Sequence, residues 1–215
     1  IPLRFLARGE RHRLLGIIDT DLHLFGVEGP GAIFLFGSDK IGRDLFSRTI
    51  YAARLSLSIG LVGIALSFTI GVTLGGISGY FGGAIDTLIQ RVIEFLMGIP
   101  SIPLWIALSA ALPRDWSITR IYLAIIVILS LVGWGGLARV VRGKLLELRE
   151  LDYVLAARVS GVSEASIIRV HLLPNFASYL IVDVTLAIPG MILGETALSF
   201  LGLGLRPPAV SWGVL

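Results

Sequence analysis

The sequence lacks cysteine altogether and has few charged residues for its length. No cysteine among 215 residues excludes disulfide bonds, thiolate catalysis and cysteine-ligated zinc within this chain. Charged residues make up 15% and hydrophobic residues 55%, whereas soluble domains average about 25% charged and about 45–50% apolar. With a mean hydropathy of +0.87, this balance disfavours a disordered chain, a nucleic-acid binder and a solvated single-core enzyme, and it indicates a membrane protein.

Catalytic signatures are missing as well. A phosphate-binding loop reads GxxxxGK[ST]. The nearest candidate, Gly143-Lys144, has Ala138 in place of the first glycine and Leu145 in place of the Ser/Thr. The three histidines are scattered singly, and no catalytic triad or metal-ligating cluster is visible. We therefore expect a chain that is not an enzyme and that holds no cofactor or metal of its own.

What the sequence has instead is long apolar runs. A transmembrane helix needs about 20 mostly apolar residues. Leu55–Ile77 is uncharged for 23 residues, about 35 Å of helix at about 1.5 Å per residue. Three further runs follow, and the last, Phe176–Gly194, is interrupted only by Asp183. We predict an all-α fold, a polytopic transmembrane helical bundle, with spans at about 55–77, 92–112, 121–141 and 176–198 and a segment without a span at 1–54.

The first two spans carry helix-packing and helix-bending signals. Small residues recur every fourth position in the first, at Gly63, Ser67, Gly71 and Gly75; this spacing opens a groove that another helix backbone can approach closely, within the chain or from a partner. In the second span, Pro100 and Pro103 lack amide donors and predict a kink or break. Arg91 and Glu94, three residues apart at its start, predict an ion pair at the helix end.

Asp183 is the one charge well inside an apolar run. An intramembrane carboxylate is a functional candidate by default. Two interpretations stay open: a group that caps, pairs or stays hydrated near the end of its helix, and a group that lines a transport pathway.

The loop at 142–175, between the third and fourth spans, is too charged to span a membrane. Its apolar residues are three or four positions apart and predict one amphipathic helix: Leu145, Leu148, Leu151, Leu155 and Val159. Gly161 follows where a helix-ending residue with positive φ is expected. Ser163 can cap a second short helix, with Glu164 in its first turn, and Pro174 is predicted to end the unit. A docking element projecting from the membrane is the favoured interpretation.

This loop resembles the EAA loop of ABC importer permeases, Glu-Ala-Ala-x3-Gly-x9-Ile-x-Leu-Pro. Ala156, Ala157, Gly161, Leu173 and Pro174 match that pattern, whereas position 155 is Leu and position 171 is His. Two more stretches narrow the resemblance to dipeptide/oligopeptide permeases: GSDKIGRDLFSR at 37–48 looks like the family's GTDxxGRD segment, and ETALSFLGLGLRPPAVSWG at 195–213 is similar to the end of its penultimate span and the loop after it.

The resemblance implies a type I ABC importer permease fold with four visible spans of six, one missing before Ile1 and one after Leu215. Basic residues near the spans divide evenly between the two sides, so sidedness comes from the resemblance alone: the 142–175 loop would be cytoplasmic and residues 1–54 extracytoplasmic. The implied function is that of a multi-pass subunit of the bacterial inner membrane that forms part of a di-/oligopeptide pathway.

The implied partners are a second homologous permease, two ABC ATPase subunits that carry ATP and Mg, an extracytoplasmic solute-binding protein and membrane lipid. The 163–170 helix would be the coupling helix that docks on an ATPase. Alternatives stay open: an ABC permease for nickel, glutathione, opines or oligosaccharides, an ion-coupled secondary transporter, which would show inverted repeats and midplane charges, or a membrane scaffold.

Overall fold

The computed structural model describes residues 3–14, 17–27, 33–113 and 115–215. The chain divides into two compact units, residues 1–50 and residues 51–215. The first contains a β-hairpin and the turn that starts the first long helix, and the second contains the helical bundle.

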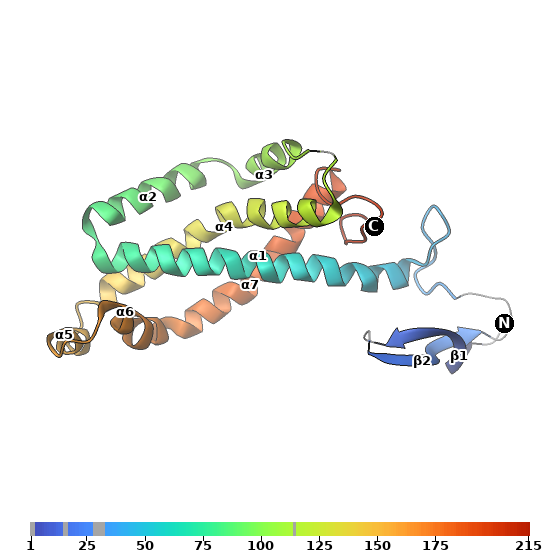
Figure 1. Ribbon diagram of the computed structural model, residues 1–215, viewed down its shortest axis with the longest axis horizontal. Helices are drawn as coiled ribbons and strands as arrows, with labels where there is room; N and C mark the ends of the chain where they lie inside the picture. The colour runs from blue at the N-terminus through green and yellow to red at the C-terminus, as the bar shows by residue number, and fades with distance from the viewer. Residues whose placement is uncertain (1–2, 15–16, 28–32, 114) are drawn as a thin grey trace. The chain divides into compact units, whose positions relative to one another are not determined.

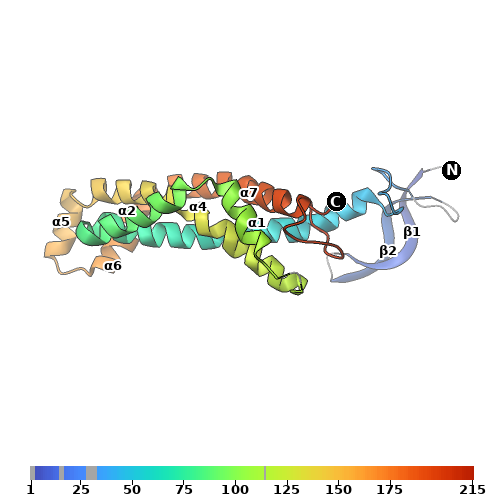
Figure 2. The same cartoon turned by 90° about the horizontal axis from the view of Figure 1, so that it is seen from above.

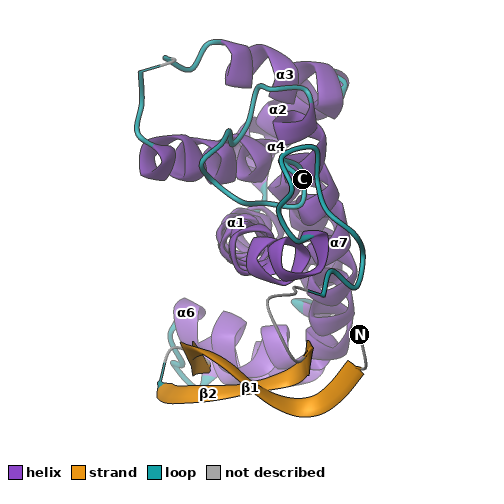
Figure 3. Ribbon diagram, turned by 90° about the vertical axis from the view of Figure 1, so that its right-hand side faces the viewer, coloured by secondary structure: helices purple, strands orange, loops and turns teal. Residues whose placement is uncertain are grey.

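The N-terminal hairpin consists of β1 (Leu3–Leu14) and β2 (Ile18–Val27), paired antiparallel (Figure 3). The rings of Phe5 and Phe25 are 5.0 Å apart across the strands, and the register shifts between Arg8 and His12. The all-α prediction missed this hairpin. Sequence analysis recognises a half-buried strand by strict alternation of polar and apolar residues. In β1 the arginines and the register shift obscure this alternation.

A capped turn starts the first long helix. The carboxylate of Asp44 accepts the backbone N–H of Phe46 at 3.2 Å and of Ser47 at 3.0 Å, which satisfies two of the donors that a helix start leaves free. The helix α1 therefore begins at Leu45 and ends at Phe81. It extends well beyond the expected span at both ends.

Helices dominate the second unit (Figures 1 and 2). Three stretches are long and apolar enough to cross a membrane, and the α2–α3 pair makes a fourth if it counts as one bent span. The elements after α1 are α2 (Gly83–Gly98), α3 (Ser101–Ala110), α4 (Ile118–Leu148), α5 (Asp152–Val159), α6 (Glu164–Ser166), a π-helical segment (Ile167–Leu172), a 3-10 turn (Leu173–Phe176) and α7 (Ala177–Phe200).

The second expected span is not one helix but two, bent by 83° at residues 99–100. Ile99 is extended, at φ −95° and ψ 127°, because the residue before a proline is driven out of the α region. Pro100 then precedes α3, so the predicted break is present, and the span expected at 92–112 corresponds to the second half of α2 together with α3. Arg91 and Glu94 do pair, at 2.7 Å, but near the middle of α2 rather than at its start.

The fourth span begins earlier than expected. The stretch Glu164–Phe200 runs as one long apolar helical rod through the π and 3-10 segments. Pro174 lies in the first turn of the 3-10 segment, where its missing N–H costs little. The expectation that Pro174 ends the loop unit is therefore wrong, and Asp183 stands near the middle of this rod.

The core lies in apolar clusters along the bundle. At the end that carries α5, buried side chains from α1, α4, α5 and the rod meet: Tyr80, Leu137, Val141, Leu145, Val154, Ile167, Leu172, Phe176 and Leu180. Towards the other end, α1, α4, α7 and the loop after α7 contribute Ile59, Ile125, Ile126, Leu129, Leu198 and Leu205. A large share of the remaining apolar side chains is exposed, as expected of surfaces that face lipid.

Candidate functional site

The first candidate site is the α5–α6 loop, at one end of the bundle (Figure 1). The expected single helix over 145–159 is wrong: α4 ends at Leu148, and α5 starts at Asp152. The apolar stripe is divided accordingly, because Leu145 is fully buried whereas Val159 is 91% exposed. Periodicity alone did not reveal this break, since the turn between the helices preserves the spacing.

Gly161 makes the turn after α5. Its φ is +78°, which confirms the expected left-handed conformation. The N–H of Val162 donates to the carbonyl of Ala157 at 3.1 Å, and the N–H of Gly161 donates to the carbonyl of Arg158 at 3.0 Å. This pair of bonds is a Schellman motif. A Cβ at Gly161 would meet no atom within 4 Å, so the glycine is required by backbone conformation and not by space.

Two arginines fasten the loop to the end of α1. The Nη1 of Arg149 donates to the carbonyls of Gly79 and Tyr80, both at 3.1 Å, and thereby caps the C-terminal end of that helix. The guanidinium of Arg158 donates to the Tyr80 hydroxyl at 3.0 Å and lies 3.7 Å from a carboxylate oxygen of Glu164. The loop is thus held to α1 by charged groups.

The underside of the loop is buried, and its outer face is apolar and exposed. Val154, Ile167 and Leu172 are fully buried against α1 and α4. By contrast, Leu155 is 40% and Val170 53% exposed. A firmly packed base with an uncovered apolar face is the usual form of a docking element rather than of a flexible loop.

The other residues expected in this loop lie as follows. Ser163 stands at the N-cap of α6, but its side chain makes no capping hydrogen bond. Ala156 and Pro174 are exposed, and Ala157 and Leu173 pack partly against the buried base. Close by, an open hollow is lined by Tyr153, Val170, His171, Pro174 and Asn175.

The small-residue face of α1 receives α4 of the same chain. A Cβ on Gly71 would lie 3.1 Å from the carbonyl oxygen of Trp134, and one on Gly75 only 2.5 Å from that of Ala138. The Ser67 hydroxyl donates to the carbonyl of Ser130 at 3.3 Å. Gly63 instead faces Met191 of α7. Within the described residues, the groove is filled internally.

A partly buried ion pair that sequence spacing did not reveal joins three helices near the α5 end. The Nε and Nη2 of Arg142 donate to the two carboxylate oxygens of Asp86, each at 2.5 Å. Ser78 of α1 donates to the same carboxylate at 2.5 Å and accepts from Gln90 at 3.1 Å. Asp86 and Arg142 are 56 positions apart, so no local pattern connects them.

A second unpredicted network lies towards the other end, around the fully buried Glu195. The Ser56 hydroxyl accepts the N–H of Trp212 at 3.1 Å and donates to Glu195 at 3.2 Å. The Ser199 hydroxyl accepts the N–H of Leu205 at 3.0 Å and donates to Glu195 at 2.7 Å. Each serine therefore links the loop after α7 to one carboxylate, and this fixes the loop against α1 and α7.

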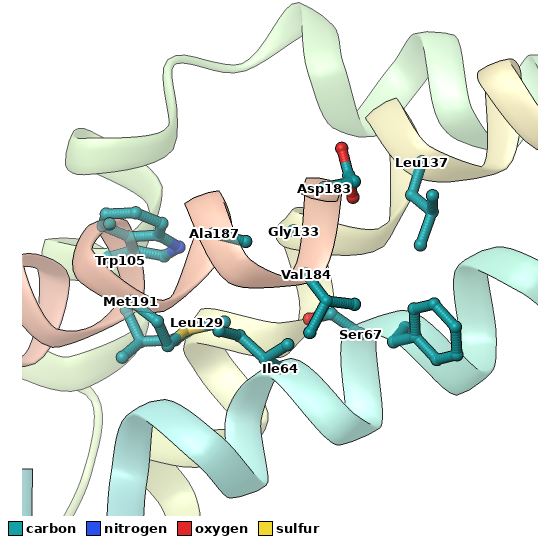
Figure 4. A pocket seen from close by; sticks show the side chains of 12 residues that line it. Ile64, Ser67, Trp105, Leu129, Gly133, Leu137, Asp183, Val184, Ala187 and Met191 are labelled. Carbon is teal, nitrogen blue, oxygen red and sulfur yellow. The ribbon is translucent and has the colours of Figure 1, made fainter. Parts of the chain in front are cut away.

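The second candidate site is a cavity of about 180 Å³ between α1, α3, α4 and α7 (Figure 4). Asp183 of α7 lines it and is partly exposed, and Trp105 of α3 and Ser67 of α1 lie on other walls. Among the described residues, none forms a hydrogen bond or ion pair with the Asp183 carboxylate. Pairing within this part of the chain therefore does not explain Asp183.

Comparison with known proteins identifies the family. Residues 71–215 match the model of a family described as "Binding-protein-dependent transport system inner membrane component". The chain belongs to this family. The matched range contains the whole α5–α6 loop. It also contains most residues that line the cavity, Trp105 and Asp183 among them.

Curated relatives and solved structures agree with this assignment. The chain is 44% identical to the dipeptide transport system permease protein DppC of Bacillus subtilis over 86% of its own length. It is 38% identical to OppC, the oligopeptide transport system permease of that organism, over 86%, and 43% identical to OppC of Haemophilus influenzae over 84%. The matches cover 56%, 59% and 56% of those proteins, so the chain spans less than two thirds of each.

The fold is shared with the MetNI methionine ABC transporter in inward-facing conformations. Two structures give TM-scores of 0.59 and 0.60 at 20% and 21% identity, and the matches cover 72% and 74% of this chain and 74% and 77% of the MetNI chains. The type I importer permease fold expected from the sequence is thereby confirmed for the helical unit.

Proposed function

We propose that this inner membrane component is part of a transmembrane subunit of an ATP-driven importer for di- or oligopeptides. The names of the DppC and OppC relatives support the peptide class. ATP and Mg are held by two separate ATPase subunits, a second homologous permease completes the pathway, and an extracytoplasmic binding protein delivers the solute.

The observation that carries the proposal is the α5–α6 loop. Its base is anchored to α1 by Arg149 and to the core by Val154 and Ile167, while the apolar Leu155 and Val159 remain uncovered. A rigid base transmits a displacement, and an exposed apolar face binds a partner. In the importer this face docks on an ATPase subunit, and Ala156, Ala157, Gly161, Ser163, Glu164, Leu173 and Pro174 form the coupling loop.

The movement reaches the bundle directly. A displacement of the loop pulls on the end of α1 through Arg149, and it pushes on α7 because α6 continues into that helix. The cavity beside Asp183 lies between α1 and α7, so we place Asp183 on the solute pathway that these helices open and close.

The test uses the full-length permease, expressed together with the other subunits of the transporter and purified in mild detergent. We expect ATPase subunits and a second permease to co-purify, and peptide uptake into reconstituted vesicles to require ATP. Val159→Asp should remove the ATPase subunits by placing a charge on the docking face, whereas the control Ile41→Asp, on an exposed apolar residue before α1, should retain them. A permease that purifies alone and transports without ATP would overturn the proposal.

A further inference from the structure

The cavity between α1, α3, α4 and α7 has one charged wall and otherwise uncharged walls. Of its twelve lining residues, Asp183 is the only ionisable one; the others are Ile64, Ser67, Phe68, Trp105, Leu129, Gly133, Leu137, Val184, Ala187, Gly190 and Met191. A carboxylate in apolar surroundings is poorly solvated, and a nearby cationic group offsets part of the lost solvation free energy. The cavity therefore favours a ligand with one positive charge.

Asp183 lies well inside the long apolar helical rod. It lies 19 residues after Glu164 and 17 before Phe200 in the rod between them. This is far from either end, so the carboxylate is not a helix-terminal group. Intramembrane carboxylates placed in this way usually face cavities or substrate paths.

A second polar group in the same cavity lacks a partner. The indole Nε1 of Trp105 is shielded from solvent and has no acceptor among the described residues. In Figure 4 this nitrogen lies on the side of the ring that faces Ala187, one helical turn beyond Asp183. A buried donor without an acceptor is costly, and a ligand oxygen would remove that cost.

We propose that this cavity binds the amino-terminal end of a peptide. The peptide ammonium pairs with Asp183, and a carbonyl oxygen of its first or second residue accepts from Trp105 Nε1. Asp183 and Ala187 are separated by about 6 Å along the helix, which is within the reach of two extended residues at about 3.3–3.6 Å each. The first side chain of the peptide lies against the apolar walls. This inference rests on the proposed function and names the chemical group that the pathway recognises.

The experiment measures equilibrium binding to the complete transporter, with both permeases and both ATPases, in nanodiscs without the binding protein. The probes are radiolabelled dialanine and its N-acetylated analogue, which lacks the ammonium. We expect the wild type to bind dialanine at least about tenfold more tightly than its N-acetylated analogue, because acetylation removes a charged hydrogen bond.

Variants at Asp183 and at Trp105 separate the two contacts. Asp183→Asn should erase the preference for the free amine, and Asp183→Glu should keep part of it. Trp105→Phe should weaken binding of both probes by a similar factor, since both retain the carbonyl. Glu94→Gln, which changes a carboxylate paired outside the cavity, should alter neither. Recovery of intact transporter at wild-type yield shows that each variant folds.

The outcomes that overturn the inference are distinct from failure of the proposed function. No binding of dialanine by the wild type, no preference for the free amine, or a preference that survives in Asp183→Asn each overturns it. Loss of the second permease from the purified Asp183→Asn complex would also overturn it, because the partner of Asp183 would then be a cation of that subunit. The proposed function fails separately, if the wild type with its binding protein shows no ATP-dependent uptake.

Discussion

Asp39 shows how strongly a single residue can be held outside the membrane spans. Its carboxylate accepts the N–H groups of Ile41 and Arg43, each at 2.9 Å, and the Arg43 guanidinium at 2.7 Å. These bonds lower the pKa of Asp39 from 3.8 to about 2, and the bond from the Arg43 backbone N–H has the largest effect. The ionised form therefore stabilises the turn above the unfolded pKa, and this stabilisation is lost as the pH falls through the folded pKa.

We predict that a reporter beside Asp39 detects this loss of stabilisation at low pH. The native chain has no cysteine, so Lys40→Cys gives one attachment point for an environment-sensitive dye. We expect its emission to be constant above about pH 4 and to change as the pH falls towards 2, and Asp39→Asn should show the low-pH emission throughout. A transition centred at the pKa of an ordinary carboxyl, near 3.8, would show that the turn does not hold the charge.

At Gly161 the relevant property is conformation alone. A residue with a Cβ pays about 1–2 kcal/mol for the left-handed conformation, and asparagine tolerates it better than valine. We predict that Gly161→Val leaves the permease in the membrane but uncouples ATP hydrolysis from uptake, whereas Gly161→Asn stays close to wild type. Measurement of both rates in vesicles tests this, and normal transport by the valine variant would remove Gly161 from the coupling mechanism.

At the scale of elements, adjacent glycines on α1 differ sharply in their surroundings. A Cβ on Gly75 would lie 2.5 Å from the carbonyl oxygen and 2.9 Å from the Cα of Ala138, which are backbone atoms, whereas a Cβ on Gly76 would meet only the flexible end of Leu145 at 3.8 Å. We predict that Gly75→Ala forces α1 and α4 apart and destabilises the permease by about 1–3 kcal/mol, and that Gly76→Ala is neutral or slightly stabilising. Thermal unfolding in detergent distinguishes the two, and equal effects would exclude close packing as the reason for Gly75.

The loop after α7 depends on the Glu195 network, and a thiol can report its attachment. Ser211 is fully buried, and its hydroxyl has no partner in the described chain, so Ser211→Cys introduces a thiol at little cost. We predict that adding Glu195→Gln speeds maleimide labelling of this thiol by about tenfold or more, because hydrogen bonds to a charged group contribute about 1.5–3 kcal/mol each. Unchanged labelling would mean that the Glu195 carboxylate does not hold the loop in place.

Sequence reasoning located elements well where the signal was local. Hydropathy found the spans, and Pro100 marked the bend, because both properties belong to consecutive residues. Pairings between distant residues left no such signal: Ser56 and Glu195 are 139 positions apart. The break in the stripe from Leu145 to Val159 is likewise not visible in local periodicity. Arg149, directly after Leu148, bonds the end of α1, which is a tertiary contact.

At the scale of the whole molecule, the anchored base of the α5–α6 loop joins the proposed docking face to the spans. Arg149 is central to this connection because its charge lies at the carbonyl end of α1, where a cation is favoured. If it were removed, α5 would still pack through Val154 and bond the Tyr80 hydroxyl through Arg158, but the carbonyls of Gly79 and Tyr80 would lose their cationic donor. Binding of an ATPase subunit and transmission of its movement are therefore separable properties.

The last prediction concerns this separation. Arg149→Gln should increase hydrogen exchange of the 152–162 segment about tenfold or more through loss of two charged hydrogen bonds, while α4 and α7 keep their protection. The ATPase subunits should still co-purify, yet uptake per ATP should fall. Lys144→Gln removes a cation from an exposed pair with Glu147, 3.0 Å away, and should change neither quantity because such pairs contribute little. If Arg149→Gln instead abolished ATPase binding without loosening the segment, Arg149 would be a contact of the partner and not the anchor that carries motion into α1.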